Sequence, residues 1–415
     1  MATGSTRTTQ ANLLRTVYQK NMRRQFSQKS ILLQAFARNT RNYSPGKEIS
    51  IPLHAASGEG PTWNSAGNLP AASFEQVERA TFSYKWLLDR IQILGDFEDD
   101  AGSAEAAEMS PYEFQTKALV KRGRHDLNFD LFGAGDGLIS DITSASSATV
   151  LIADDIRGLR NNLRVDIILK ANGAPGAGGV KNAKITLNRA TKTVTLTEGT
   201  MADGDGSDVN ANPTLYAIYR AGAYNDALFG LDAAVSASNP ASANYGNIDR
   251  SLDANDFYRS ISQLNGGVAR APSMKLMQDV IDEIDKYSEG VTDLIVCGHS
   301  VWNALAERMD SDRRYKGETT TLNGWATALR FASVNAPIVR DKHCPEGKMY
   351  FLDRSTFTIF QNNEGAWMAE DGAILHRVSG KVAYEAAWHR RLQLICWSPI
   401  SNGVLGDLAY VGAVT

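Results

Sequence analysis

The sequence has few cysteines and no long hydrophobic run. Its three cysteines, Cys297, Cys344 and Cys396, are an odd number without C-x-x-C spacing, which argues against a disulfide framework and a structural zinc site and fits a reducing cytoplasm. The most apolar stretches, at 293–297 and 392–397, are far shorter than the roughly 20 residues that cross a bilayer. The N-terminal residues contain no apolar segment of the kind found in secretory signals. We therefore expect a soluble intracellular protein that does not bind a membrane.

Motifs for nucleophilic and phosphate chemistry are also missing. The segment 297–302 has the strand-to-helix context of a nucleophile elbow, but Trp302 stands where the second glycine is required. Ser300 is better explained as the N-cap of the following helix. The glycine clusters at 133–137 and 173–179 do not lie between a strand and a helix, as dinucleotide and phosphate loops do. We expect no catalytic centre and no cofactor; a pocket of titratable groups near His299 would revive an α/β enzyme as a remote alternative.

The sequence shows no metal-binding pattern. Its six histidines have no ligand spacing such as H-x-x-x-H. The loop Asp203–Asp208 is acidic enough for calcium, but Thr214 stands where the last ligand of a calcium loop would be glutamate. A solvated loop is the interpretation that we favour.

What the sequence does have is an uneven charge distribution. The chain of 415 residues is 43% hydrophobic and 21% charged, which is typical of globular proteins, and its formal net charge is −3. Residues 1–50 hold nine Lys or Arg and one Glu, a charge of +8; the rest holds 34 basic and 45 acidic residues, a charge of −11. A basic arm on an acidic body predicts contacts between complementary surfaces.

The N-terminal quarter predicts two extensions. Residues 10–38 have apolar positions at helical spacing, interrupted by basic residues; this favours either a solvated helix or an arm that packs on a partner chain. Residues 47–56 alternate as an edge strand containing Pro52, and the chain is extended again from 74 to 94. The two runs predict a long hairpin whose tip, 57–72, is small and polar. Trp63 is the one large apolar residue at its centre.

The middle of the chain predicts a long helix followed by a β-rich segment. After an acidic linker at 96–108, Ser110 and Pro111 start a helix that runs to about Phe132 and is ended by Gly133, Gly135 and Gly137. A strand, a helix at 154–163 and another strand are expected next. Alternation and turn signals then predict a β-rich insertion over 165–230, including a hairpin at 183–196.

The C-terminal half predicts helices followed by strands. Residues 250–330 are expected to be mainly helical, with an amphipathic helix at 272–287, a strand at 294–297 and a second helix from Ser300. From Phe331 the pattern alternates again, and the segment 373–398 is strongly strand-like.

This order of parts resembles the major capsid proteins of tailed bacteriophages, whose shell-forming fold is shared with encapsulins. The resemblance rests on the basic arm, the glycine-rich hairpin, the acidic linker and the helix ending in Leu131–Gly137, whose glycines are similar to the family's G-x-G-x-G exit. The segments 331–360 and 384–399 are similar to the family's C-terminal half.

The resemblance implies an α+β fold with an arm, an extended loop, a peripheral domain built on a spine helix, an axial domain and an inserted β-subdomain. The implied boundaries are 1–46 for the arm, 47–95 for the hairpin, 96–164 for the peripheral domain, 165–235 for the insertion, 236–350 for the axial domain and 351–415 for the returning C-terminal strands.

The resemblance also implies the function. It implies a non-enzymatic subunit of an icosahedral capsid that forms hexamers and pentamers, encloses double-stranded DNA by non-specific contact and resides in the virion after assembly in the host cytoplasm. The implied partners are other copies of the chain, a scaffolding protein and a portal protein at one vertex. An encapsulin-like nanocompartment is the alternative.

The candidate interface residues follow from the same parts. Trp63 is expected to anchor in a neighbour's pocket, since Trp is enriched at interface hot spots; a locally packed Trp is the other interpretation. Some members of the family crosslink a hairpin Lys to a neighbour's Asn, but residues 49–84 contain no Lys, so we expect no crosslink by that route. The remaining expected interface residues are Arg15, Arg23, Arg24, Arg38, Arg41, Gly133, Gly135 and Gly137.

Overall fold

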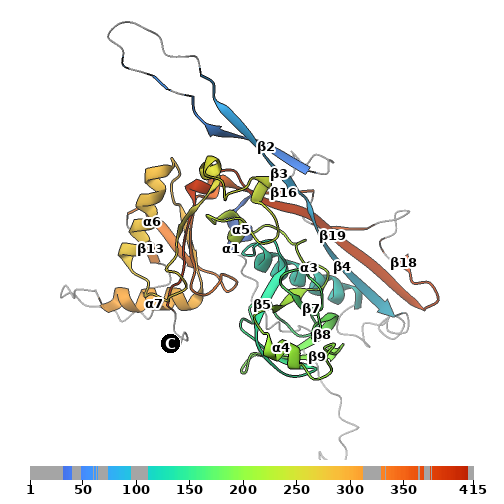
Figure 1. Cartoon of the computed structure of the whole chain (residues 1–415). Helices are drawn as coiled ribbons and strands as arrows, with labels where there is room; N and C mark the ends of the chain where they lie inside the picture. Colours follow the sequence, from blue (N-terminus) through green and yellow to red (C-terminus); the bar gives the residue numbers. More distant parts are fainter. Residues whose placement is uncertain are drawn as a thin grey trace, which may run out of the picture. The chain divides into compact units, whose positions relative to one another are not determined.

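The chain is a mixed α+β protein, as the sequence predicts (Figure 1). Its described residues fall into two compact units. The first unit takes its described residues from Leu88–Gly123 and Trp367–His389; the second takes them from Ser30–Leu87, Arg124–Ala366 and Arg390–Thr415. The computed structural model describes residues 31–39, 48–58, 60–61, 63, 73–94, 111–311, 329–331, 333–362, 365–368, 374 and 376–409.

The arm is described only at its C-terminal end. Helix α1 (Ile31–Ala35) is followed by strand β1 (Ala37–Asn39), so the predicted helix does not continue to residue 38. The reason is tertiary: β1 pairs in parallel with β16 (Phe357–Gln361), and the Phe36 ring stacks on Phe357 at 4.8 Å. The rest of the predicted helix and the acidic linker at 96–108 lie outside the described residues.

The predicted hairpin is confirmed for its stem, but only residues 76–83 of its second run, 74–94, pair in it; residues 85–94 pair with the strand Ala383–Cys396 instead. Strands β2 (Glu48–Ala56) and β3 (Gln76–Ser83) pair antiparallel in a two-stranded sheet, seen side by side in Figure 1. Pro52 is opposite Arg79, in a sheet where both strands are edges and a missing amide is tolerated. The base of the hairpin is anchored by Phe82, which is buried and meets the Tyr245 ring edge-on at 5.0 Å.

The first unit joins part of the long helix to a sheet. Helix α3 (Pro111–Asp130) confirms the predicted helix and continues into the second unit. Within the first unit, the Trp388 ring lies over Gly123, and Arg122 donates to the Asp89 carboxylate at 2.8 Å. This sheet has six strands: besides β1 and β16 they are β4 (Lys85–Leu94), β17 (Ala366–Trp367), β18 (His376–Arg377) and β19 (Ala383–Cys396). Strands β16, β4, β17 and β18 all pair with β19.

A closed six-stranded barrel follows α3 in sequence. Its order is β10-β5-β6-β9-β8-β7, and its core is made of the inward side chains of these strands, among them Val165, Ile185 and Ile218. The β-rich segment that the sequence places at 165–230 therefore also recruits 138–153. The elements are β5 (Leu138–Ser147), β6 (Val150–Ala153), β7 (Arg164–Leu169), β8 (Val180–Asn188), β9 (Thr193–Glu198), α4 (Ser207–Ala211) and β10 (Tyr216–Arg220).

The helix expected at 154–163 is wrong. The chain makes tight turns there instead: Leu159 N–H donates to Ile156 O, and Leu163 N–H donates to Arg160 O, the three-residue spacing of turns rather than the four-residue spacing of an α-helix. Asn162 has a left-handed φ of 63°, which ends any helix. The end of this segment bonds to β8 instead: Asn162 N–H donates to Ile185 O, and Ile185 N–H donates to Leu163 O.

The predicted helices of the C-terminal half pack on a six-stranded sheet with order β11-β20-β15-β12-β14-β13. Helices α6 (Met274–Tyr287) and α7 (His299–Ser311) share one core with alternate side chains of this sheet, including Ile295 and Phe351. The neighbouring positions, such as Val296 and Tyr350, belong to a second core. The strands are β11 (Ile261–Gln263), β12 (Leu294–Cys297), β13 (Leu329–Phe331), β14 (Ala336–Arg340), β15 (Met349–Leu352) and β20 (Gly403–Leu405).

Two details of this half differ from the sequence predictions. Helix α7 begins at His299, so Ser300 lies in its first turn and is not the N-cap. Residues 250–273 are not α-helical: they form the 3-10 segment η3 (Asp253–Tyr258) and strand β11, because their backbone is bonded to β20 and to the loop at 236. The other short elements are α5 (Leu231–Ala234), η2 (Tyr245–Asn247), η4 (Arg354–Thr356) and η5 (Pro399–Ser401).

None of the described helices combines the length and the apolar character required to cross a bilayer.

Candidate assembly surfaces

The hairpin carries large apolar side chains that are exposed to solvent in the part of the chain that the structure describes. Trp63 is fully exposed, and Phe74 and Val77 are also mostly exposed. An anchoring role for Trp63 in a neighbour's pocket stays a prediction. Large exposed apolar side chains grouped on one extension are typical of a surface that is covered by a partner.

The stem of the hairpin carries mainly acidic side chains. Glu48 and Glu78 are exposed, and Glu75 bonds His54 at 2.5 Å, a contact that lowers the pKa of the Glu75 carboxyl. Arg79 is the exposed cation among the described residues of the two strands. An acidic stem with apolar side chains at its outer end suits a partner surface that is basic and apolar.

Of the arm arginines, the structure describes Arg38 and not Arg15, Arg23, Arg24 or Arg41. Arg38 is exposed on β1, and its guanidinium donates to Leu33 O at 3.0 Å. It therefore helps to hold the turn between α1 and β1, and an intermolecular role for the five arginines stays a prediction.

The glycines at the end of α3 have roles within the chain. Gly135 and Gly137 have left-handed φ angles of 87° and 79°. A Cβ at Gly135 would lie 2.5 Å from the Phe229 ring, and one at Gly137 would lie 2.3 Å from Ala223 O. These two glycines allow the helix exit to pass close to the segment 223–230, whereas Gly133 meets only its own helix end, at Asp130 O. Contacts within the chain thus explain Gly135 and Gly137 without a neighbouring subunit. A role in assembly stays a prediction for all three glycines.

Two polar clusters had no signal in the sequence. Arg250 is buried and donates to Ala233 O, Ala234 O and Ser236 O at 2.8 to 3.1 Å, with its guanidinium 4.7 Å from the Tyr245 ring centre. Burial lowers its pKa, but an arginine remains charged. Nothing in the local pattern distinguishes this arginine from a surface one.

The second cluster lies on the C-terminal turns of α3. Asp126 forms ion pairs with Arg160 and Arg220 of the barrel, and Arg220 also reaches Asp130 at 3.0 Å. Burial by itself raises the pKa of Asp126, but the hydrogen bond with His125 and the two arginine charges outweigh it and hold that pKa well below its usual range. This cluster fastens the barrel to α3.

The cysteines and the acidic loop at 203–208 are buried or engaged within the fold. All three cysteines are buried, and burial raises the pKa of Cys297 and of Cys396 to about 12, so neither thiolate forms near neutral pH. In the loop considered for calcium, Asp203 accepts from Gly206 N–H and Asp208 N–H, and Asp208 accepts from the Tyr216 hydroxyl. The carboxylates are thus used by the loop itself, and within the described ranges no group of His, Cys, Asp and Glu is placed to hold a metal ion.

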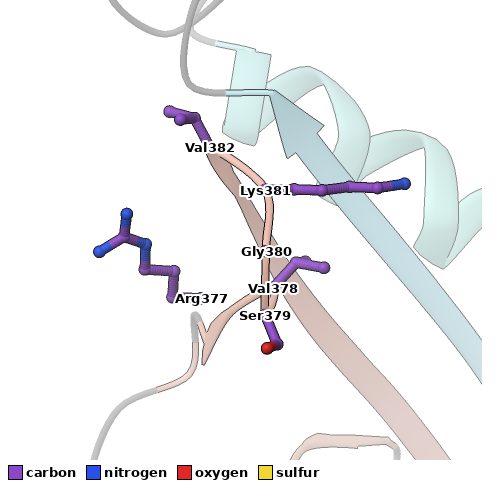
Figure 2. Close-up of a pocket in the computed structure, with 6 residues that line it drawn as sticks. All are labelled: Arg377, Val378, Ser379, Gly380, Lys381 and Val382. Atoms are coloured by element: carbon purple, nitrogen blue, oxygen red, sulfur yellow. The ribbon is translucent and has the colours of Figure 1, made fainter.

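A hollow of about 340 Å³ lies at the turn between β18 and β19. Its two cations, Arg377 and Lys381, point in different directions (Figure 2). Because they do not converge on one position, they do not form an anion site, and the hollow offers no constellation for catalysis.

Comparison with known proteins identifies the fold. No protein-family model and no curated protein matches the sequence. Among solved structures, the chain is similar to the cyanophage A-1(L) capsid asymmetric unit, with 13% identity, a TM-score of 0.61, and coverage of 97% of this chain and 99% of that one.

The capsid of a native GTA particle is similar at 10% identity and a TM-score of 0.58, with 98% and 100% of the two chains covered. The capsid of an empty GTA particle is similar at 9% identity and a TM-score of 0.54, with 96% of each chain covered. The chain therefore has the fold of capsid subunits, as the resemblance in the sequence implies.

Proposed function

We propose that this chain, which has the fold of capsid subunits over nearly its whole length, is the structural subunit of an icosahedral shell that encloses double-stranded DNA. The observation that carries the proposal is the match with the cyanophage capsid subunit, which leaves almost no part of either chain unaccounted for. The same fold supports a structural role and not catalysis.

The hairpin supplies the physical argument for self-assembly. A two-stranded sheet is marginally stable alone, and its apolar side chains Trp63, Phe74 and Val77 are exposed in the single chain. Covering them with other copies of the chain removes apolar surface from water. We propose that hexamers and pentamers form in this way, with the basic arm on acidic surfaces of neighbours.

The proposed partners follow from the same assignment. They are a scaffolding protein during assembly, a portal protein at one vertex and the enclosed DNA, bound without sequence preference. The finished subunit resides in the virion after assembly in the host cytoplasm. The axial, peripheral and inserted domains of the capsid fold are proposed at 236–350, 96–164 and 165–235, with the observed barrel extending the last of these toward residue 138.

Electron microscopy of the protein expressed with and without the scaffolding protein of its own genome tests the proposal. We expect closed particles whose absorbance ratio at 260 and 280 nm indicates DNA when packaging components are present. Particles that hold a cargo enzyme and no nucleic acid would favour the nanocompartment alternative. A protein that stays monomeric when the scaffolding protein is co-expressed would refute the shell.

The variant Trp63→Ser tests the hairpin as an interface. Because Trp63 buries nothing within its own chain, the melting temperature of the subunit should not change. A buried interfacial Trp contributes about 2 kcal/mol or more, so the concentration needed for assembly should rise at least tenfold. Leu215→Ser, at another exposed apolar position on the barrel, is the matched control and should assemble normally.

A further inference from the structure

A buried histidine lies in the turn that follows β14. His343 is 2% exposed, and neither of its ring nitrogens has a hydrogen-bond partner among the described residues. Its ring meets the His125 ring edge-on at 4.6 Å and the Phe129 ring at 6.0 Å. A neutral imidazole carries one N–H, so this ring holds a buried donor and a buried acceptor against two aromatic neighbours.

Three parts of the second unit meet at this histidine. Asn128 of α3 donates to the Asp341 carboxylate at 3.3 Å. The same carboxylate accepts a hydrogen bond from the backbone N–H of His343 at 2.9 Å. Arg157, in the turns between β6 and β7, donates to His343 O at 3.1 Å. The turn at 341–344 thus connects α3 with both the barrel and the sheet of β14, and its contact with α3 depends on an uncharged ring.

The groups that face His343 make a proton there unfavourable. Burial is the main reason why the pKa of His343 falls to about 3, and His125, Lys342 and Arg157 add to it; Asp126 opposes them. Asp126 is already held by Arg160 and Arg220, and Asp341 is engaged with backbone and amide N–H groups. The remaining neighbours of the turn are Cys344, which is buried, and Glu346.

We propose that the contact between His343 and His125 is an acid-sensitive junction, which releases α3 from the turn at 341–344 when His343 takes up a proton. The proton would place a cation in a buried site beside Arg157 and Lys342, where the carboxylates of Asp126 and Asp341 already accept from other groups. Opening the junction lets water solvate the charged His343 ring. The inference concerns the single chain and does not depend on shell formation, so the two can fail separately.

The sign of the effect follows from the two protonation states. An unfolded His has its ordinary pKa of 6.5, and the folded value is about 3. The closed form therefore has its full stability above pH 6.5, and the equilibrium constant for closing falls about tenfold for each pH unit below that. Because the pKa of Asp126 is lowered in the folded chain, the stability that Asp126 contributes is lost only as the pH falls below the usual 3.8. The loss due to His343 begins at higher pH, so the two losses of stability occur in different pH ranges.

Urea unfolding of the full chain at pH 7.5 and pH 5.0 tests the junction. Between these values the folding constant of the natural protein should fall about 30-fold more than that of His343→Phe, whose ring does not titrate. Equal pH dependence in the natural protein and His343→Phe would overturn the proposal.

A second measurement needs no variant and covers the case that His343→Phe does not fold. Hydrogen exchange at the imidazole C2 position, followed by mass spectrometry, reports the pKa of individual histidines in the natural chain. We expect His343 to titrate well below 6.5, and backbone amides near 341–344 and at the C-terminal end of α3 to lose protection together as the pH falls toward 4.5. A His343 pKa near 6.5, or amides that stay protected, would refute the junction.

Discussion

Arg250 shows how much of the second unit depends on a single side chain. Its guanidinium satisfies the carbonyls at the C-terminal end of α5 and is also 5.4 Å from the centre of the Tyr258 ring, which stacks on Tyr245. A short helix end buried without donors would be strongly unfavourable. The arginine replaces the water that these carbonyls would otherwise need.

Replacing Arg250 by Met should therefore destabilise the chain by about 3 kcal/mol, because several buried carbonyls lose their donors. Urea unfolding measures the change. Arg354→Met is the control, since Arg354 pairs with Asp293 at a half-exposed site and such pairs contribute about 1 kcal/mol or less. Similar losses in the two variants would contradict the role given to Arg250.

Gly137 is a second residue whose importance is steric. Gly137→Ala must adopt a left-handed φ of 79° and also place a methyl group 2.3 Å from Ala223 O. Gly222→Ala has the same kind of strain, at φ 72°, but no atom within 4 Å of the new Cβ. We expect a loss of about 1 kcal/mol for Gly222→Ala and a clearly larger one for Gly137→Ala, measured as urea midpoints; equal midpoints would contradict the close approach.

At the scale of elements, α3 acts as a connector. Within the second unit its last turns bind the barrel through Asp126 and Asp130, and they bind the turn after β14 through Asn128. These contacts are polar, and each has defined partners, so the relative placement of these parts depends on charge as well as on apolar packing.

The variant Asp126→Asn should lose about 3 kcal/mol of stability near pH 7, since it leaves two arginines at a buried site without their shared carboxylate. Because the pKa of Asp126 is lowered in the folded chain, the difference from the natural protein should shrink as the pH falls below 3.8. Asp279→Asn, which removes an exposed pair with Lys275, should change stability by less than about 0.5 kcal/mol. Thermal unfolding across pH checks both.

The barrel should fold as an isolated fragment. All the buried residues of its core lie between Ile139 and Ile218, and its first and last strands are neighbours, with Leu138 opposite Tyr219. A closed barrel also leaves no strand edge open. We expect the fragment 135–224 to show dispersed amide signals by nuclear magnetic resonance and a cooperative thermal transition; an unfolded fragment would show that the barrel depends on α3.

At the scale of the whole molecule, the basic arm and acidic body remain the main signal of self-association. The charge difference of +8 against −11 gives complementary surfaces, and contacts between exposed charges of this kind weaken with salt. Contacts made by the apolar side chains at the outer end of the hairpin, by contrast, are not weakened by salt. Assembly that uses both should be weakened, but not abolished, at high ionic strength.

The absence of Lys from 49–84 predicts that assembled particles are not crosslinked through the hairpin. Lys85, the next lysine, lies outside this range and is paired with Asp226 at 2.5 Å. Mature particles should therefore run as one band of 45.1 kDa on denaturing gels. A ladder of larger species would contradict this prediction.

The sequence by itself determined the elements whose residues interact locally. The hairpin strands, α3, α6 and β12 follow from periodicity, caps and turn residues, and their order was enough to indicate the capsid fold. The exposed Trp63 was also visible in the sequence, since no other large apolar residue stands near it.

The tertiary structure alone decided the features that depend on distant residues. Closure of the barrel recruited 138–153 and replaced the helix expected at 154–163 by turns, because strand pairing across the barrel competes with local helix formation. Arg250 and His343 look like ordinary polar residues in the sequence. Their burial comes from segments far away along the chain, and a periodic pattern contains no information about such contacts.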